Sequence, residues 1–360
     1  MSETPVIEYC NNILPGHGPR KSVRDTLSDL VDHLSGEEQA DHYGKGEYLE
    51  QFESRLAAMF GKAAGVFMPS GTMAQQIALR VWCEQKNNFT VAMHPTSHLE
   101  TAEQLGYQFL HGMHRLQFGV PEMLGHRTLR AEDLKALPQT PGATLIELPY
   151  RPLGGELPSW ETLVEIRRWA QSNQVPLHLD GARIWQCRPF YQKSLEEIGA
   201  LFDSVYVSFY KDLGALAGCM LMGPEPFIQI CRMWQRRYGG NLYSQAVNVV
   251  SAQLQLDRVL PAIDGWVDRA REIASAFAAI DGVRVYPDPP HTNMFRLFIE
   301  GDAERLMARH TALARETGTF LFHQLSPSVV PGIAWTEVHV WENAMTFDLA
   351  GLTAVMKALR

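Results

Sequence analysis

Three segments of this chain carry residues whose types and positions suit chemistry. In SVYVSFYKDLG, Lys211 follows an apolar strand-like run, and in PLHLDGARIW another such run leads to Asp180 and Arg183. The third segment, PSGTMAQQIAL, opens a helix-like run with small residues, namely Ser70, Gly71 and Thr72. Together the three segments offer a nucleophilic amine, a carboxylate that can face a cation, and a helix N-terminus that can bind an anion.

A pyridoxal phosphate (PLP) enzyme needs these three groups. The apolar flanks of Lys211 are expected to desolvate its amine, which lowers the pKa and favours the neutral form that makes a Schiff base. Asp180 would keep the pyridine nitrogen protonated, so that the ring withdraws electrons. A unit charge pair about 4 Å apart is worth roughly 4 kcal/mol at an effective dielectric near 20, which is enough to shift that pKa. The helix start would bind the phosphate, and Arg183 would reach the phenolate oxygen or a substrate carboxylate.

Each residue also has an ordinary structural interpretation. A strand-end lysine is usually solvated, a carboxylate there often caps a helix, and Ser-Gly-Thr is a common N-cap. Arg183 would then form an ion pair with Asp180. His94 and His98 are spaced like some metal ligands, but Pro95 breaks any helix between them and no HExxH pattern is present, so no metal site is predicted. His98 is better suited to stack on the cofactor ring, and its alternative role is that of a polar core histidine.

The segments around these residues alternate between strand-like and helix-like patterns. We expect seven short strands, in AAGVFM, FTVAM, RLQF, GATLIEL, VPLHLD, SVYVSFY and GCMLMG, and helices over 72–84, around 101–106 and near 160–172. Several of the strands are apolar on both faces, which predicts an α/β fold with a mostly parallel sheet between helices. Ligands in such sheets lie at the carboxyl ends of strands, where Lys211 and Asp180 fall.

Composition shifts predict three regions. Residues 1–40 are polar and punctuated by Gly and Pro, which indicates an arm with one short helix. Residues 41–261 form the expected large cofactor-binding domain. Pro261 and Gly265 mark a boundary, after which mixed strand and helix patterns predict a smaller α+β domain over 262–360.

Bulk composition bears on partners and location. The 360 residues are 46% hydrophobic with a formal net charge of −8, which argues against nucleic acid and anionic membranes as partners. Five scattered cysteines without a CxxC pattern favour free thiols in a reducing compartment. The N-terminal residues do not resemble a signal peptide, and no apolar run is long enough to span a bilayer as a helix. A soluble cytoplasmic protein is therefore predicted.

The order and spacing of these segments resemble the threonine aldolase / β-eliminating lyase family of fold-type-I PLP enzymes. The likeness is densest from Tyr43 to Gly240, and LHLDGARIW is its most specific match. It implies Lys211 as the Schiff-base residue, His98 as the stacking residue followed by Glu103, and a homodimer or homotetramer with shared active sites. The implied cofactor-binding residues are Ser70, Gly71, Thr72, His98, Asp180, Arg183, Ser208, Lys211 and Arg236, where Arg236 would contact the neighbouring subunit's phosphate. The implied substrate-binding residues are Tyr43 and Arg183.

Several positions depart from the family pattern, mainly on the substrate side. They are Cys10-Asn11 for a Ser-Asp pair, Tyr150 for a histidine, Tyr210 and Asp212 beside the lysine, Tyr243 in a glycine-rich loop, and Trp335 for an arginine that would bind the substrate carboxylate. Arg151, Arg296 or His339 are candidates to replace that arginine.

Three functions remain open on sequence grounds. The first is an aldehyde-lyase that cleaves a β-hydroxy-α-amino acid, such as threonine or allo-threonine, to glycine and an aldehyde. The second is another PLP reaction of an amino acid, namely β-elimination, racemisation or transamination. The third is a PLP-binding protein with a regulatory role, which the absence of a basic stripe or a DNA-binding segment argues against. The products formed from amino acids would distinguish these functions.

Overall fold

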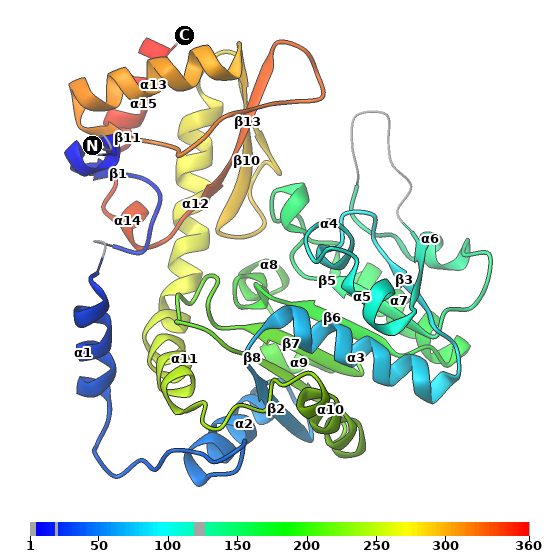
Figure 1. The fold of residues 1–360 in the computed structure, drawn as a ribbon. Helices are drawn as coiled ribbons and strands as arrows, with labels where there is room; N and C mark the ends of the chain where they lie inside the picture. Colours follow the sequence, from blue (N-terminus) through cyan, green and yellow to red (C-terminus); the bar gives the residue numbers. More distant parts are fainter. Residues whose placement is uncertain (1–4, 19–20, 119–126, 360) are drawn as a thin grey trace. The chain divides into compact units, whose positions relative to one another are not determined.

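A computed structural model describes residues 5–18, 21–118 and 127–359. These residues divide into two compact units (Figure 1). The larger unit contains residues 21–118, 127–149 and 157–261. The smaller unit contains residues 5–18, Tyr150–Glu156 and 262–359. The first segment of the chain and a short internal segment thus fold with the C-terminal part.

The larger unit is built on a seven-stranded sheet in the order β2-β8-β7-β6-β5-β3-β4. Its strands are β2 (Ala64–Met68), β3 (Thr90–Met93), β4 (His114–Gln117), β5 (Ala143–Glu147), β6 (Leu177–Gly181), β7 (Ser204–Ser208) and β8 (Cys219–Gly223). Strands β4, β3, β5, β6 and β7 run parallel, and β8 is antiparallel to both β7 and β2. The mostly parallel sheet and all seven strands predicted from the sequence are confirmed.

Helices surround this sheet. They are α1 (Val23–His33), α2 (Glu47–Met59), α3 (Gly71–Lys86), α4 (His98–Thr101), α5 (Gly106–His111), α6 (Ala131–Lys135), α7 (Trp160–Asn173), α8 (Arg188–Tyr191), α9 (Leu195–Gly199), α10 (Glu225–Arg237) and α11 (Ala246–Val259), with a 3-10 turn, η3 (Ile184–Cys187). Helix α3 packs across several of the strands and against α10, while α2 packs on β2 and β8.

The helix predicted around residues 101–106 is wrong. Helix α4 ends at Thr101, α5 begins at Gly106, and Gln104 and Leu105 between them have positive φ angles of 52° and 56°. This turn brings the Glu103 carboxylate into the interior, where it has hydrogen-bond partners. Since a buried carboxylate without partners is costly, these bonds outweigh the local preference for helix.

A buried polar network ties α3 to the sheet beneath it. The His178 ring on β6 lies 2.7 Å from the Ser204 hydroxyl on β7 and 2.6 Å from the Gln75 side-chain oxygen on α3. The Trp82 indole on α3 also donates to the Ser204 hydroxyl, at 2.8 Å. The start of α3 is thereby fixed relative to the strand ends.

The smaller unit contains a four-stranded antiparallel sheet in the order β12-β13-β10-β9 and a parallel pair, β1 and β11. The strands are β9 (Val283–Tyr286), β10 (Met294–Glu300), β12 (Ser326–Pro327), β13 (Ile333–His339), β1 (Asn12–Ile13) and β11 (Thr319–Phe320). The helices are α12 (Ile263–Ala278), α13 (Ala303–Thr317), α14 (Glu342–Met345) and α15 (Leu349–Leu359), with the 3-10 turns η1 (Val6–Tyr9), η2 (Arg151–Leu153) and η4 (Leu260–Ala262).

Two general features concern the whole chain. All five cysteines are free, and four of them are buried. Among the helices of the described residues, none combines the length and apolar character needed to cross a membrane.

Candidate active site

The first part of the candidate site is the N-terminus of α3. Ser70 caps the helix in an extended conformation, and its hydroxyl accepts a hydrogen bond from the Met73 N–H at 3.4 Å. Gly71 is buried, and a Cβ placed there would lie 1.9 Å from the Tyr206 hydroxyl oxygen. Only glycine therefore fits. Thr72 is exposed in the first turn. The N-terminus of this 16-residue helix presents backbone N–H groups and a positive dipole end.

Lys211 and Asp180 lie at the carboxyl ends of adjacent parallel strands. Asp180 is on β6 opposite Tyr206 on β7, and Lys211 follows three residues after the end of β7. Burial lowers the pKa of Lys211, while the Asp180 charge opposes that shift. Burial raises the pKa of Asp180, and the Lys211 charge and the Ala182 N–H, 3.0 Å away, oppose that shift. Each ion thus provides part of the solvation that the other has lost on burial.

His98 lies beside this pair and is oriented by two carboxylates. Its Nδ1 is 2.9 Å from Glu103 Oε1, and its backbone N–H donates to Glu147 Oε1 at 2.7 Å. The other Glu103 oxygen accepts from the Gln76 side chain at 3.1 Å. The Glu103 side chain is only 2% exposed, whereas the His98 side chain is 41% exposed. The ring is therefore held at one nitrogen and open elsewhere, as a stacking residue requires.

Glu147 is a site residue that the sequence reasoning missed. It ends β5 and pairs in register with Asp180 on β6. Burial and the Asp180 charge raise the pKa of Glu147, and the hydrogen bond from the His98 N–H opposes that shift. The signal was present in the GATLIEL segment, because the strand-end rule that identified Asp180 applies there too.

Arg183 has a different partner from the one suggested by sequence proximity. Among the described residues its ion pair is with Asp212, Nε to Oδ2 at 3.7 Å, so the predicted alternative of a pair with Asp180 is wrong. Asp212 is 1% exposed and also accepts from the Gln186 side chain at 2.6 Å. Because Asp212 follows Lys211 directly, it sets the position of Arg183 next to the lysine.

Other candidates are less closely associated with this group. Ser208 is buried at the end of β7, and burial raises the pKa of Tyr210, whose hydroxyl bonds with Tyr206 and with the Gly71 N–H. Tyr43 is 58% exposed and packs edge-on against Tyr243. Arg236 is exposed in the last turn of α10, and no ion pair within the described part of the chain includes it. Among the described residues of one chain, Arg236 thus makes no contact that links it to Lys211 or Asp180.

Comparison with known proteins identifies the family. The profile of the β-eliminating lyase family matches residues 32–300. The chain belongs to the β-eliminating lyase family. A crystal structure of a Listeria monocytogenes protein named as a candidate L-allo-threonine aldolase is 38% identical, with a TM-score of 0.91 over 98% of this chain and 97% of that one.

Two curated relatives of this lyase carry names for different reactions. Low-specificity L-threonine aldolase 1 of Arabidopsis thaliana is 27% identical over 301 residues, which cover 79% of this chain and 82% of the relative. Alanine racemase TOXG of Cochliobolus carbonum is 31% identical over 209 residues, which cover 56% of this chain and 52% of the relative. The family and fold are therefore common to proteins with different reaction names.

As a family member the chain is a PLP-dependent lyase, and its larger unit fits that cofactor. A partly buried amine lies near enough to a buried carboxylate to interact with its charge, and a helix N-terminus without room for a side chain at Gly71 adjoins the same strand ends. A cofactor with an aldehyde, a basic ring nitrogen and a phosphate matches these three groups. Within the described residues, no three His, Cys, Asp or Glu side chains are grouped so that they could hold a metal ion.

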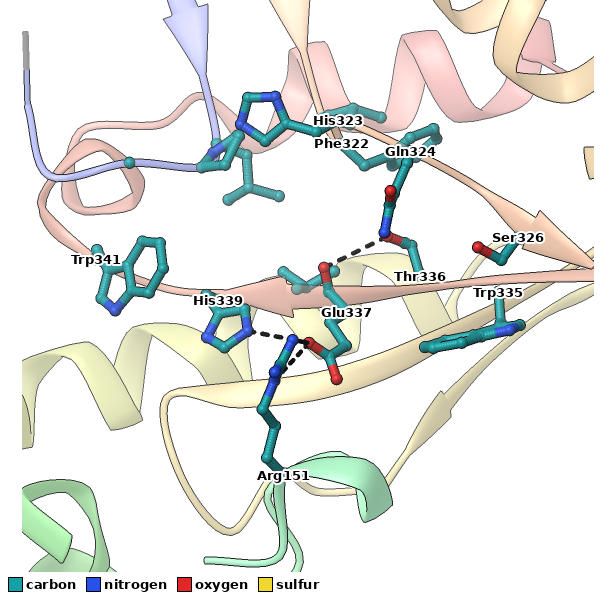
Figure 2. A pocket seen from close by; sticks show the side chains of 15 residues that line it. Arg151, Phe322, His323, Gln324, Ser326, Trp335, Thr336, Glu337, His339 and Trp341 are labelled. Atoms are coloured by element: carbon teal, nitrogen blue, oxygen red, sulfur yellow. Dashed lines mark hydrogen bonds and ion pairs between the residues drawn. The ribbon is translucent and has the colours of Figure 1, made fainter. Parts of the chain in front are cut away.

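The smaller unit of the lyase contains a separate pocket of about 350 Å³ (Figure 2). Its wall includes Trp335, Glu337 and His339, which alternate along β13 and therefore share one face of the sheet. Arg151 donates to Glu337 Oε2 from Nε at 3.0 Å and from Nη2 at 2.8 Å. The position predicted to lack the carboxylate-binding arginine, Trp335, is therefore part of an aromatic and charged pocket.

Proposed function

We propose that this enzyme cleaves a β-hydroxy-α-amino acid of the threonine or allo-threonine type to glycine and an aldehyde. The observation that carries the proposal is the grouping of Lys211, Asp180 and the His98–Glu103 pair at neighbouring strand ends of the larger unit. The relatives named as threonine aldolases support the same reaction.

In this proposal Lys211, Asp180 and the start of α3 bind the cofactor. Lys211 Nζ would hold it covalently, and its lowered pKa makes the neutral amine more available for that bond. Asp180 would hold a proton on the ring nitrogen, and Ser70, Gly71 and Thr72 would receive the phosphate. When bound, PLP supplies an electron sink that stabilises negative charge at the substrate α-carbon. Ser208 and Arg183 complete the proposed set.

His98 is the proposed base for the substrate. If Nδ1–H donates to Glu103 Oε1 at 2.9 Å, Nε2 is left as an acceptor that can take the proton of a β-hydroxyl group. Glu103, itself bonded to Gln76, holds the tautomer and the ring orientation. Tyr43 and Arg183 are the proposed substrate contacts.

Product analysis tests the reaction. PLP-loaded protein is incubated separately with L-threonine and L-allo-threonine, and glycine and acetaldehyde are quantified. Equal amounts of both products are expected, and His98→Asn should lower kcat by roughly 100-fold, as for loss of a general base. If neither amino acid gives acetaldehyde while another amino acid is converted, the aldolase assignment is wrong.

Two observations favour a different PLP reaction. The relative named as an alanine racemase and the altered substrate-side residues, such as Trp335, support racemisation or elimination on another amino acid. Loss of optical rotation of L-alanine would reveal racemisation, release of a keto acid would reveal elimination, and conversion of the cofactor to its amine form would reveal transamination.

We also propose a homodimer or homotetramer in the cytoplasm, with active sites shared between subunits. The exposed Arg236 on α10 is the proposed contact to the neighbouring subunit's cofactor phosphate. Light scattering after size-exclusion chromatography should give a multiple of the 40.5 kDa chain mass. Arg236→Gln should weaken PLP binding about tenfold without changing that mass, and a monomeric wild type would contradict the proposal.

A further inference from the structure

Two carboxylates lie side by side at the carboxyl edge of the large sheet. Glu147 ends β5, and the strand register pairs it with Asp180 on β6. Partners in neighbouring strands point to the same face of a sheet, and these two residues are only 7% and 6% exposed. Two buried like charges repel each other, so one carboxyl of such a pair keeps its proton at a pH where an isolated carboxyl is ionised.

The cations near this pair are fewer than the carboxylates. The titratable groups that act on Glu147 or Asp180 come from α4, the turn after it and the chain after β7, namely His98, Glu103 and Lys211. The His98 ring already lies against Glu103, and Arg183, which adjoins Lys211, is paired with Asp212. Lys211 is thus left to balance both strand-end carboxylates.

Glu147 is therefore poised between its neutral and its ionised form. Burial and the Asp180 charge raise its pKa to about 7, against the hydrogen bond from the His98 N–H. A further cation beside Asp180 would favour ionisation of both carboxylates, because it offsets their repulsion. The ring nitrogen of PLP, when protonated, is such a cation.

Glu147 also holds the first residue of α4. Its Oε1 accepts a hydrogen bond from the His98 N–H at 2.7 Å, whereas the N-cap residue Ser97 makes no side-chain cap. A carboxylate from β5 thus takes the place of a local cap. A hydrogen bond to an ionised acceptor is roughly twice as strong as one between neutral groups, so the charge on Glu147 affects how firmly the His98 backbone is held.

We propose that Glu147 is a positioning residue that shares one proton with Asp180 in the cofactor-free chain and loses this proton when a pyridinium cation binds at Asp180. The proton leaves the Glu147 carboxyl group for the buffer, and no bond to the cofactor forms or breaks in this step. The ionised carboxylate then holds His98 more firmly in its stacking position. This inference rests on the roles of Asp180 and His98 in the proposed function. By linkage, cofactor affinity rises as the pH rises through about 7.

Pyridoxine 5′-phosphate tests this coupling, because it has an alcohol in place of the aldehyde and cannot attach to Lys211. The cofactor-free full-length protein is titrated at pH 7 by calorimetry in two phosphate-free buffers of different ionisation enthalpy, which gives the protons released per site. The wild type should release about half a proton more than Glu147→Gln, since a group with a pKa near 7 is half protonated there. Glutamine keeps the size of the side chain and can still accept from the His98 N–H.

Glu53→Gln is the matched control. Glu53 is another buried glutamate of the larger unit whose pKa is raised by burial, but its partners are Arg232 and the Phe67 N–H on the edge strand β2. This variant should release as many protons as the wild type. Asp180→Asn should release no more than Glu147→Gln, since Glu147 then has no neighbouring carboxylate with which to share a proton.

Hydrogen exchange followed by mass spectrometry measures the effect on His98. With saturating pyridoxine 5′-phosphate, the amide of His98 should exchange about fivefold more slowly in the wild type than in Glu147→Gln, which is the difference expected between a charge-assisted and a neutral hydrogen bond. A purely structural role of Glu147 would alter this exchange without altering proton release, and that result would overturn the shared proton.

The remaining outcomes separate this inference from the proposed reaction. Equal proton release in the wild type and Glu147→Gln, an equal loss in Glu53→Gln, or full release in Asp180→Asn overturns the coupling. Failure of the wild type to bind pyridoxine 5′-phosphate rejects the proposed cofactor site and the inference with it. No amino acid enters the titration, so a protein that shows the predicted release but forms no acetaldehyde from threonine or allo-threonine retains the coupling and loses the aldolase assignment.

Discussion

At Lys211, burial and the neighbouring Asp180 carboxylate act on the amine in opposite directions. Burial favours the neutral amine, and the carboxylate favours the ammonium. A cofactor with a protonated ring nitrogen gives Asp180 a second cation to stabilise, so that the amine is left free for covalent attachment. The proposed function therefore gives different tasks to two residues that the sequence could only place at strand ends.

Replacement of the Asp180 carboxylate tests this division of tasks. Asp180→Asn keeps the size of the side chain but removes its charge, so the ring nitrogen loses the partner that holds its proton. We expect PLP to remain attached while kcat falls roughly 100-fold or more, which corresponds to about 3 kcal/mol. Measurement of bound PLP and of kcat on the same samples checks both points. A variant with normal kcat would show that Asp180 does not hold that proton.

At the residue scale, the sequence correctly placed Asp180 and Lys211 at the ends of apolar strands. It missed Glu147, and it placed Arg183 beside Asp180 rather than Asp212. The pairing of Arg183 depends on how η3 turns after β6 and on the chain after β7, and neither geometry is encoded in residue spacing. The predicted roles of the site residues, Asp180 and Lys211 included, stay predictions.

At the scale of elements, the order of strands positions the site. Strands β5, β6 and β7 are neighbours, so their carboxyl ends bring Glu147, Asp180 and Lys211 to one edge. The sequence predicted these strands correctly, since several of the strands are apolar on both faces, as sheets between helices require. The short helix around 101–106 was predicted wrongly, because the buried bonds of Glu103 come from residues distant in the sequence or across a turn.

The close approach of α3 to β7 gives a stability prediction. Gly71→Ala places a methyl group against the Tyr206 hydroxyl, which is buried and cannot move freely. We expect the free energy of unfolding to fall by about 1–3 kcal/mol, as for overpacked cores, and PLP affinity to fall with it. Chemical denaturation measures the first quantity.

Gly265→Ala is the matched control for this prediction. Gly265 lies in α12, has no strained φ, and a Cβ there would meet nothing closer than Met345 at 3.9 Å. Its substitution should be neutral or stabilising by up to about 1 kcal/mol. Equal stability changes in the two variants would mean that the α3–β7 contact is not tight.

At the scale of the whole molecule, buried neutral histidines make stability depend on pH. Burial lowers the pKa of His178 to about 3, and that of His111 and of His310 to about 4, from an ordinary value of 6.5. The folded chain stays neutral at these positions while the unfolded chain takes up protons below pH 6.5. Stability is therefore present above pH 6.5 and is lost as the pH falls from there toward 4.

Urea unfolding at pH 7.5 and pH 5.5 measures this effect. The free energy of unfolding should be lower at pH 5.5 by about 1 kcal/mol for each such histidine, since one pKa unit is worth about 1.4 kcal/mol. The loss should be smaller in His178→Asn than in the wild type. Equal or greater stability at pH 5.5 would contradict the neutral assignment of these histidines.

The site of covalent PLP attachment tests the account of the larger unit most directly. PLP-loaded protein is treated with borohydride, digested and analysed by mass spectrometry, with Lys193→Ala as a control at a lysine paired with Glu197 on the surface. We predict that the reduced cofactor is found on the peptide containing Lys211, in both the wild type and the control, and is absent from Lys211→Ala. Cofactor on any other lysine, or its retention in Lys211→Ala, would contradict the assignment on which the proposed mechanism rests.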